Sequence, residues 1–325
     1  MMTAQKVAVL DLGTNTFNLL LVKITPSAYY IFHNEKIPVK IGKDGINQGI
    51  ITKEAQDRAL LALDKYNEII KNEKIDKVFG YATSAFRNAK NGEEFRKLIK
   101  QKTGLQINII SGDIEAEFIY KGVKTAFDIG GDNALIIDIG GGSVEFIICN
   151  REQIYWKQSF DIGAQRLLDW FHTIDPIPAD EIERLNKFFD KELRSLEEQI
   201  KLYSPNCLIG SSGTFDTLSE MEQHLVNRFL KGDEAELPLS VSGFEKLFKK
   251  LITLDKENRL KLAGMMPMRV DMIVVAACLV KYVIDKFNFN QIRVSAHSLK
   301  EGMIHVIQEE MIDHKNLQIA SNKVK

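Results

Sequence analysis

The stretch Asp11-Leu12-Gly13-Thr14-Asn15-Thr16 recurs as a pattern at Asp138-Ile139-Gly140-Gly141-Gly142-Ser143. Each copy lies between two apolar runs, which is the pattern of two strands joined by a tight turn. In each, a glycine stands two residues after the aspartate and a hydroxyl residue stands five residues after it. Turns of this kind expose backbone N–H groups that can bind phosphate oxygens. The repeat predicts an α/β protein with pseudo-repeat symmetry that grips a polyphosphorylated ligand from two sides.

The composition is that of an ordinary soluble, cytoplasmic protein. The chain has 325 residues, 45% hydrophobic and 27% charged, which is enough for two domains with separate cores. The formal net charge of −1 gives no reason to expect nucleic acid or a membrane surface as partner. Three widely spaced cysteines indicate a reduced compartment and no structural zinc. Asp11 interrupts the first apolar run before a signal peptide could form, and Met272–Val280 predicts a buried helix rather than a membrane span.

Hydrophobic periodicity predicts strands followed by helices in both halves. Residues 6–42 predict an antiparallel meander, and Thr52 is the expected N-cap of a helix that runs to Lys74. The Gly/Asp-rich connector 128–133 places the domain boundary so that residues 1–126 form one lobe and 127–302 the other, with a helix at 303–325 that can pack back on the first. The other expected segments are strands at 78–81, 107–110 and 207–209, a polar loop after residue 81, and helices at 92–102, 113–123, 165–172, 179–203, 243–253, 269–286 and 298–312.

Two common phosphate-binding motifs are excluded by the sequence. Strand-like residues Val144–Ile148 follow the second turn where a dinucleotide-binding motif would have a helix. No G-x-x-x-x-G-K-[ST] segment occurs, which excludes a P-loop. Either turn alone is more often a simple tight turn, but two copies with the same flanks favour phosphate binding by Gly13–Thr16 and Gly140–Ser143.

The aspartate that opens each turn suggests a divalent cation. Asp11 and Asp138 each end a strand, and a carboxylate beside phosphate is repulsive unless a hard cation lies between them. Mg²⁺ suits this position because it bridges carboxylate to phosphate and keeps several waters. Glu145, the seventh residue after Asp138, can reach the same ion. The seventh residue after Asp11 is Asn18, so we expect the ion, Mg²⁺ or another divalent cation, nearer the second lobe.

Three further segments carry candidate residues, each with a structural alternative. Glu115 begins a helix, where it either meets the helix dipole or acts as a general base for a water that attacks phosphorus. Arg87, after a strand, is either a surface charge or a bidentate phosphate ligand. Ser212-Gly213-Thr214 precedes a helix as an N-cap or as a third anion-binding turn. From the residues alone these alternatives stay open.

These motifs, in this order, resemble the exopolyphosphatase / guanosine pentaphosphate phosphohydrolase family of the actin and sugar-kinase superfamily, in its short two-domain form. The resemblance covers about residues 6–305. Weaker matches lie at Ser212–Thr214 and Arg269–Asp271. The segments that carry it are Asp11-Leu-Gly-Thr-Asn-Thr-Phe-Asn18, Ala82-Thr-Ser-Ala-Phe-Arg-Asn-Ala89, Ser111-Gly-Asp-Ile-Glu-Ala116 and Asp138-Ile-Gly-Gly-Gly-Ser-Val-Glu145.

The resemblance implies a fold of two actin-like (ribonuclease H-like) lobes, each a mixed sheet flanked by helices, with an interdomain cleft. It implies that Glu115 is the catalytic base and that Arg87 neutralises charge near the scissile group. Asp138 and Glu145 would place the divalent ion, and the turns would cradle phosphates. The residues of these turns are Gly13, Thr14, Asn15, Thr16, Gly140, Gly141, Gly142, Ser143, Ser212, Gly213 and Thr214.

Three departures from the family pattern affect what can be expected. Ser298-Leu-Lys-Glu-Gly302 stands where the family often has Gly-Leu-Arg-Glu-Gly, and lysine keeps the charge without the planar fork. Val275-Ala-Ala277 replaces a segment that commonly includes a glycine. The chain stops at Lys325, so the extra C-terminal helical domains of longer members are not expected, which bears on processivity.

The expected activity is hydrolysis of a terminal phosphoanhydride in inorganic polyphosphate and/or guanosine pentaphosphate. One alternative is a sugar-kinase-type phosphotransferase that uses polyphosphate or ATP, for which no acceptor site can be named. Another is a non-catalytic polyphosphate or alarmone sensor, although the intact Glu115, Asp138 and Glu145 count against it. The choice between the two substrates stays open, as does the oligomeric state, with a homodimer as one option.

Overall fold

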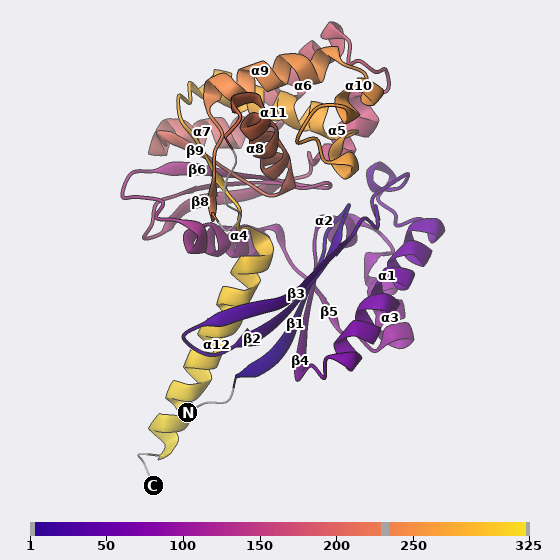
Figure 1. Ribbon diagram of the computed structural model, residues 1–325, viewed down its shortest axis with the longest axis vertical. Coiled ribbons are helices and arrows are strands. Elements are labelled where there is room, and N and C mark those ends of the chain that lie inside the picture. The colour runs from indigo at the N-terminus through magenta and orange to yellow at the C-terminus, as the bar shows by residue number, and fades with distance from the viewer. Residues whose placement is uncertain (1–3, 229–233, 323–325) are drawn as a thin grey trace. The chain divides into compact units, whose positions relative to one another are not determined.

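The computed structural model describes residues 4–228 and 234–322, and it divides into two compact units. The first unit comprises residues 1–111 and 300–325, and the second comprises residues 112–299 (Figure 1). The predicted boundary near residue 126 differs from this division, because the helix α4 (Gly112–Ala126) packs on the sheet of the second unit.

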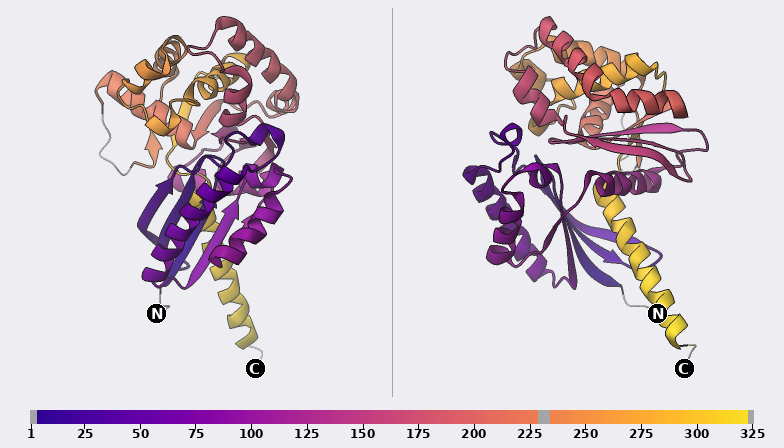
Figure 2. Two further views of the ribbon diagram at one scale, coloured as in Figure 1. Left: turned by 90° about the vertical axis from the view of Figure 1, so that its right-hand side faces the viewer. Right: turned by 180° about the vertical axis from the view of Figure 1, so that it is seen from behind.

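The first unit is a five-stranded mixed sheet in the order β3-β2-β1-β4-β5. The first three strands form the predicted antiparallel meander, and the last two run parallel to β1. Helices α1 and α3 cover one face and α12 lies along the other (Figures 1 and 2). The bounds are β1 Gln5–Leu12, β2 Phe17–Ile24, β3 Tyr29–Ile37, η1 Ile46–Gln48, α1 Lys53–Asn72, β4 Lys77–Ala82, α2 Ser84–Asn88, α3 Gly92–Thr103, β5 Ile107–Ile109 and α12 Leu299–Asn322.

The second unit repeats the topology of the first. Its sheet has the order β8-β7-β6-β9-β11, with the same strand directions, and a short strand β10 added at the edge. The strands are β6 Ala134–Ile139, β7 Val144–Cys149, β8 Ile154–Phe160, β9 Cys207–Ser211, β10 Glu236–Leu237 and β11 Ile292–Ser295. The helices besides α4 are α5 Ala164–Phe171, α6 Ala179–Glu192, α7 Arg194–Tyr203, α8 Gly213–Val226, α9 Val241–Thr253, α10 Lys256–Leu260, η2 Pro267–Arg269 and α11 Ile273–Phe287.

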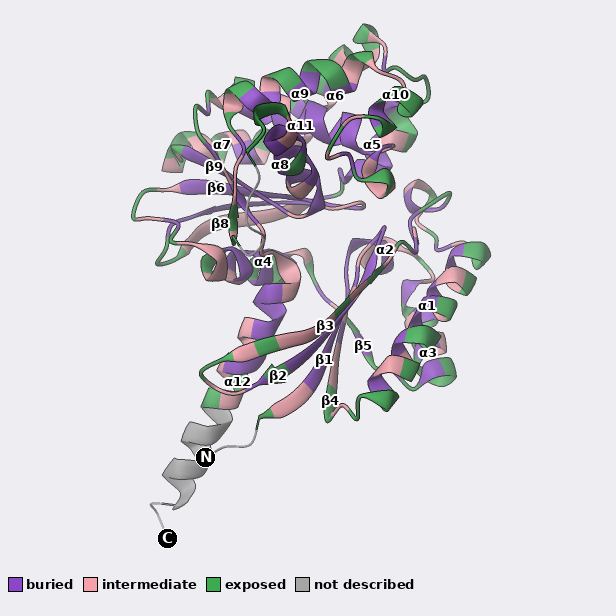
Figure 3. Ribbon diagram, in the orientation of Figure 1, coloured by how far each residue is buried: buried purple, intermediate pink, exposed green. Residues whose placement is uncertain are grey.

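Alternation along the central strands separates two faces of the second sheet. Leu135 and Ile137 on β6 belong to the large core under α5, α6, α8, α9 and α11. Ala134 and Ile136 belong instead to a smaller core under α4. Both faces of the sheet are therefore covered, and the strands β6 and β7 are buried along their length (Figure 3). Because side chains alternate, the residue after Ile137 must lie on the α4 face.

Several predicted segments are confirmed. Thr52 caps α1 by accepting a hydrogen bond from the backbone N of Ala55 at 3.2 Å. The apolar run at residues 272–280 is a buried helix, and all three cysteines are buried and free. Within the described ranges, no helix combines the length and apolar character needed to cross a bilayer.

Other segments differ from expectation. The single helix predicted at 179–203 is two helices, because the backbone at Leu193 leaves the helical range (φ −99°, ψ 20°) and its side chain turns into the core. The polar loop after β4 contains the short helix α2, so Arg87 is held on a helix rather than on a free loop. The strands β8 and β11 and the helix α10 were not foreseen.

Candidate functional site

The two repeated turns have the same backbone closure. In the first turn the N–H of Gly13 donates to the carbonyl of Thr16 at 3.1 Å, and in the second the N–H of Gly140 donates to the carbonyl of Ser143 at 3.0 Å. A side chain at either glycine would bring Cβ to 3.0 Å from that carbonyl. The repeat read from the sequence is therefore a repeat in structure, with glycine required at both positions by close approach of the backbone.

Residues at the start of helix α5 donate hydrogen bonds to the carbonyl groups of the second turn. The hydrogen bonds are Ala164 N to Gly140 O (2.9 Å), Gln165 N to Gly141 O (2.8 Å), Gly163 N to Gly142 O (3.3 Å) and Arg166 Nε to Gly142 O (2.9 Å). In a trans peptide the C=O and the following N–H point in opposite directions. The N–H groups of residues 141–143 consequently point away from α5, as an anion-binding turn requires.

The first turn is held by a loop instead of a helix. The carbonyl of Thr14 accepts from Gly42 N at 3.1 Å, and that of Asn15 accepts from Lys40 N at 2.8 Å. The same opposition of C=O and N–H leaves the N–H groups of Asn15 and Thr16 pointing away from this loop. Both turns thus keep the backbone orientation that the phosphate-binding prediction needs, and that role stays a prediction.

Asp138 and Glu145 lie side by side on the α4 face of the second sheet. They are directly opposite in the β6–β7 ladder, and their exposed fractions are 6% and 1%. Burial, and then the charge of Glu145, raises the pKa of Asp138 to about 7, although the side chains of Ser211 and Ser212 donate hydrogen bonds to it. Two buried carboxylates that repel each other are stabilised by a cation between them.

Glu115 lies on the helix that covers this face. It is only 6% exposed and lies one turn after Gly112, on the same side of α4. A Cβ built on Gly112 would lie 2.4 Å from Cβ of Ser159 on β8, so this side of α4 is in direct contact with the sheet. Fold and register thus bring Glu115 to the face that carries Asp138 and Glu145.

The corresponding aspartate of the first unit has a different neighbour. Asp11 lies opposite Asn18 in the β1–β2 ladder, and the Nδ2 of Asn18 donates to Oδ2 of Asp11 at 2.8 Å. Burial raises the pKa of Asp11 to about 6, opposed by this hydrogen bond and by the charge of Lys300. The other oxygen, Oδ1, is enclosed and has no partner among the described residues. An enclosed carboxylate oxygen of this kind fits a cation ligand, and the metal role of Asp11 stays a prediction.

Arg87 is fixed at the end of β5. Its Nη1 donates to the carbonyl of Ile110 at 3.0 Å, which fixes the direction of its guanidinium group. The expected contact with the scissile phosphate is not tested by this geometry.

Ser212, Gly213 and Thr214 form the start of α8. Ser212 is the N-cap residue, with a left-handed φ of 75°, and Thr214 is buried. A Cβ on Gly213 would lie 2.0 Å from Nη2 of Arg269, so the guanidinium group of Arg269 packs directly on this turn. The turn combines a helix N-terminus, a buried hydroxyl and a neighbouring cation, which fits the anion-binding prediction without testing it.

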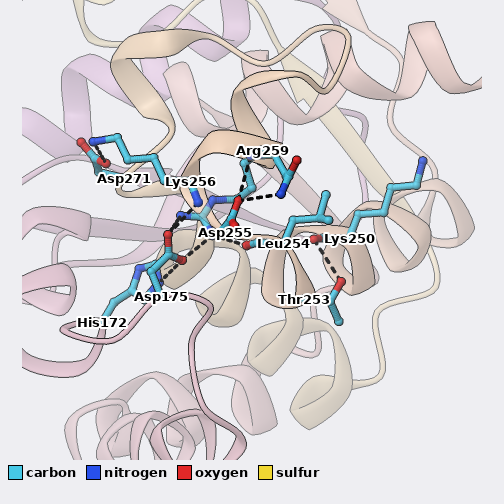
Figure 4. Close-up of polar contacts among 10 residues, drawn as sticks. His172, Asp175, Lys250, Thr253, Leu254, Asp255, Lys256, Arg259 and Asp271 are labelled. Carbon is cyan, nitrogen blue, oxygen red and sulfur yellow. Dashed lines mark hydrogen bonds and ion pairs between the residues drawn. The ribbon is translucent and has the colours of Figure 1, made fainter.

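The far end of α5 is tied down by an ionic cluster in the same unit (Figure 4). Arg259, 1% exposed, holds both oxygens of Asp175, at 2.7 Å and 3.1 Å. His172, which ends α5, lies 3.1 Å from the same carboxylate, and Lys256 pairs with Asp271 at 2.6 Å. The helix that supports the second turn is therefore anchored at both ends.

Three residues of this arrangement were not predicted as site residues. A Cβ on Gly163 would lie 2.5 Å from the backbone of Gly141 and Gly142, and Arg166 holds Gly142. Ser159 donates from Oγ to Oε1 of Glu145 at 2.7 Å. Ser159 could have been noticed as a polar residue in a strand-like segment. Its contact with Glu145, however, depends on the pairing of β7 with β8.

The acidic pair fits a divalent cation of the magnesium type. Among the described residues no group of three or more His, Cys, Asp or Glu side chains could enclose a metal ion. Magnesium commonly uses only one or two protein carboxylates and completes its shell with water and substrate phosphate. Asp138 and Glu145, buried and mutually repulsive, are a donor pair of that kind.

Comparison with known proteins identifies the family. The Ppx/GppA phosphatase family matches residues 20–310. The crystal structure of an exopolyphosphatase from Cytophaga hutchinsonii is 42% identical with a TM-score of 0.90, covering 94% of this chain and 98% of that one. An Aquifex aeolicus member of the Ppx/GppA family, 23% identical with a TM-score of 0.76 and covering 95% and 98%, has the same fold, in which the two expected lobes are each a mixed sheet flanked by helices.

A curated relative shows how the same unit occurs in a larger protein. The bifunctional 3-dehydroquinate synthase/phosphatase of Fusobacterium nucleatum is 31% identical over 309 residues. These residues are 91% of this chain but only 46% of that protein. The family match spans most of the present sequence and includes Arg87, Glu115, Asp138 and Glu145. The chain therefore belongs to the Ppx/GppA phosphatase family.

Proposed function

We propose that this protein is an exopolyphosphatase that releases the terminal phosphate of inorganic polyphosphate, with guanosine pentaphosphate as a second substrate of the same chemical class. The observation that carries the proposal is the buried pair Asp138 and Glu145 on the sheet face covered by the helix of Glu115. The name of the Cytophaga hutchinsonii protein supports the polyphosphate assignment. Both substrates end in a phosphoanhydride, which is the group that the proposed site would bind.

The chain's own residues have separate tasks in this reaction. The Glu115 carboxylate accepts a proton from a water, whose oxygen forms a bond to the terminal phosphorus. The bond from phosphorus to the bridging oxygen breaks, and the shortened chain leaves with the bridging oxygen. The N–H groups of residues 141–143 and the start of α8 hold phosphate oxygens. In the first unit, Gly13–Thr16 and Arg87 are the proposed phosphate-binding groups.

Asp138 and Glu145 would hold Mg²⁺. A bound Mg²⁺ would neutralise charge on the phosphate oxygens. The role of Glu115 does not depend on this charge neutralisation, since proton acceptance is a property of the carboxylate itself. The two contributions are therefore separable by mutation.

The proposal is tested by phosphate release from short polyphosphate, long polyphosphate and guanosine pentaphosphate, compared for the wild type and Glu115→Gln. We expect kcat to fall by roughly two to four orders of magnitude, the usual contribution of general base catalysis, with KM little changed. Asp113→Asn is the matched control, because Asp113 lies on the same helix and is exposed.

Two outcomes would contradict the proposal. If Glu115→Gln hydrolyses polyphosphate within about threefold of the wild type, Glu115 is not the base. If phosphate appears only when ADP or another acceptor is present, and ATP forms in its place, the protein is a phosphotransferase. Release of guanosine pentaphosphate's terminal phosphate with no release from polyphosphate would reassign the substrate and leave the site unchanged.

A further inference from the structure

Ser159 joins two parts of the proposed site. It lies on β8 directly opposite Glu145, and its hydroxyl donates to Oε1 of Glu145 at 2.7 Å. The next residue, Phe160, belongs to the large core on the opposite face, so alternation places Ser159 on the α4 face. It therefore shares a face with Asp138 and Glu145.

The same residue is in contact with the helix of the proposed base. A Cβ built on Gly112 would lie 2.4 Å from Cβ and 3.0 Å from Oγ of Ser159, so α4 begins in direct contact with Ser159. Two residues before Ser159, Lys157 pairs with Glu117 of α4. The strand β8 thus contacts α4 at Gly112 in its first turn and at Glu117 in its second, and Glu115 lies between these residues in the sequence.

A hydroxyl in this position restricts what Glu145 can do. Glu145 is 1% exposed, so it cannot take a replacement hydrogen bond from bulk solvent. The donor at Oε1 favours one orientation of the carboxylate plane. Hydrogen-bond partners of metal-binding carboxylates typically change metal affinity by about 10- to 100-fold when they are removed.

We propose that Ser159 is a positioning residue, which orients the Glu145 carboxylate toward the divalent cation and sets the place of the α4 first turn that carries Glu115. The inference rests on the proposed function, since it concerns the same cation. Beyond that function, it assigns to Ser159 of β8 the orientation of a carboxylate on the neighbouring strand. Ser159 acts in this role through its hydrogen bond to Glu145.

The test is a comparison of Ser159→Ala with Ser195→Ala. Ser195 on α7 donates to Oε1 of Gln158, the neighbour of Ser159 on β8, at 2.9 Å. Alternation places Gln158 on the other face of β8, so the control removes a similar hydrogen bond away from the site. Mn²⁺ affinity is measured without substrate by electron paramagnetic resonance, and thermal unfolding is recorded for each protein in EDTA.

We expect Ser159→Ala to weaken Mn²⁺ binding by about 10- to 100-fold, while Ser195→Ala binds like the wild type. The Mg²⁺ concentration for half-maximal phosphate release should rise by a similar factor. Ser159→Cys, which keeps a weak donor, should give an intermediate affinity and replaces the alanine variant if that one does not fold. Equal Mn²⁺ affinity in folded Ser159→Ala and wild type would overturn the inference alone. No Mn²⁺ binding by the wild type would overturn the proposed cation site and this inference with it.

Discussion

The two turns share one backbone closure, but the residue opposite the aspartate differs between the two units. Each is closed by the same glycine N–H hydrogen bond, at 3.1 Å in the first unit and 3.0 Å in the second. Opposite the aspartate, however, the first unit has the amide of Asn18 and the second has the carboxylate of Glu145. An amide donor stabilises a buried aspartate, whereas a second carboxylate repels it. The repeated backbone therefore provides the phosphate-binding geometry, and the unrepeated position determines where a cation is expected.

Of the three comparisons below, replacing the Glu145 carboxylate by an amide should change the rate of phosphate release most. Glu145→Gln makes the second turn resemble the first, and we expect kcat/KM for phosphate release to fall by about 100- to 1,000-fold, as for the loss of one group that stabilises transition-state charge. Because the substitution also removes the repulsion on Asp138, the melting temperature in EDTA should rise. The reverse change, Asn18→Asp, should lower the melting temperature, since Asp11 loses its donor and gains a like charge. A fall in melting temperature for Glu145→Gln would show that the buried pair is not strained without metal.

The supports of the two turns can be compared with a pair of glycine substitutions. Gly163→Ala would place a Cβ 2.5 Å from the backbone of the second turn, which cannot move without losing its hydrogen bonds to α5. We expect a loss of about 1–3 kcal/mol in the free energy of unfolding, together with a raised KM for polyphosphate. Gly42→Ala meets a methyl group of Thr14 at 2.5 Å, a side chain that can rotate away from the turn.

The measurements for this pair are chemical denaturation and initial-rate kinetics. The Gly42→Ala protein should show the smaller change in KM. If both substitutions raise KM equally, the two turns contribute equally to substrate binding, and the helix support has no special importance.

The smallest expected effect concerns the anchor at the far end of α5. Burial lowers the pKa of His172, although Asp175 opposes the shift, so protonation is less favourable in the folded state than in the unfolded one. The stability that neutral His172 contributes is fully present above about pH 6.5, its pKa in the unfolded chain. It is lost as the pH falls from there through the lower pKa of the folded state. Burial would raise the pKa of Asp175, but Arg259, the backbone N–H of Lys256 and His172 together lower it, so the stability that this carboxylate contributes is lost only at much lower pH.

Melting temperatures at pH 7.5 and pH 5.5 check this prediction. The wild type should lose more stability over that interval than His172→Gln, which keeps a hydrogen-bond donor and does not titrate. Equal losses in the two proteins would place the acid sensitivity elsewhere. Because the cluster anchors α5, KM for polyphosphate should rise more in the wild type than in His172→Gln between pH 7.5 and pH 5.5, whereas protonation of Asp138, whose pKa is about 7, affects both proteins alike.

The repeated turn could be predicted because its signal is local. A glycine and a hydroxyl at set distances from Asp11 and Asp138 determine the backbone, and Thr52 likewise marks the start of α1 within one turn. The acidic pair was also predictable, since two strands joined by a short turn must bring Glu145 opposite Asp138. Ser159 was not, because its contact with Glu145 depends on the register of a strand that was itself not foreseen.

Long-range packing accounts for the other differences. The helix α4 follows a strand of the first unit in sequence, yet its apolar residues face Ile136 and Ile147 of the second, which no local pattern reveals. The break between α6 and α7 at Leu193 also depends on tertiary packing, because Leu193 and Leu196 are both buried in the large core. Periodicity along one segment describes that segment only, and partners must come from the assembled fold.

The discontinuity of the first unit has a consequence for the order of folding. The second unit is one continuous segment, 112–299, and it separates α12 from the strands that α12 packs against. The hydrogen bond from Gln308 to the carbonyl of Thr25 joins residues 283 positions apart. Closing so long a loop costs less entropy when the intervening chain is already compact. During synthesis, the second unit can therefore fold before the first is complete, because α12 is synthesised only after residue 298.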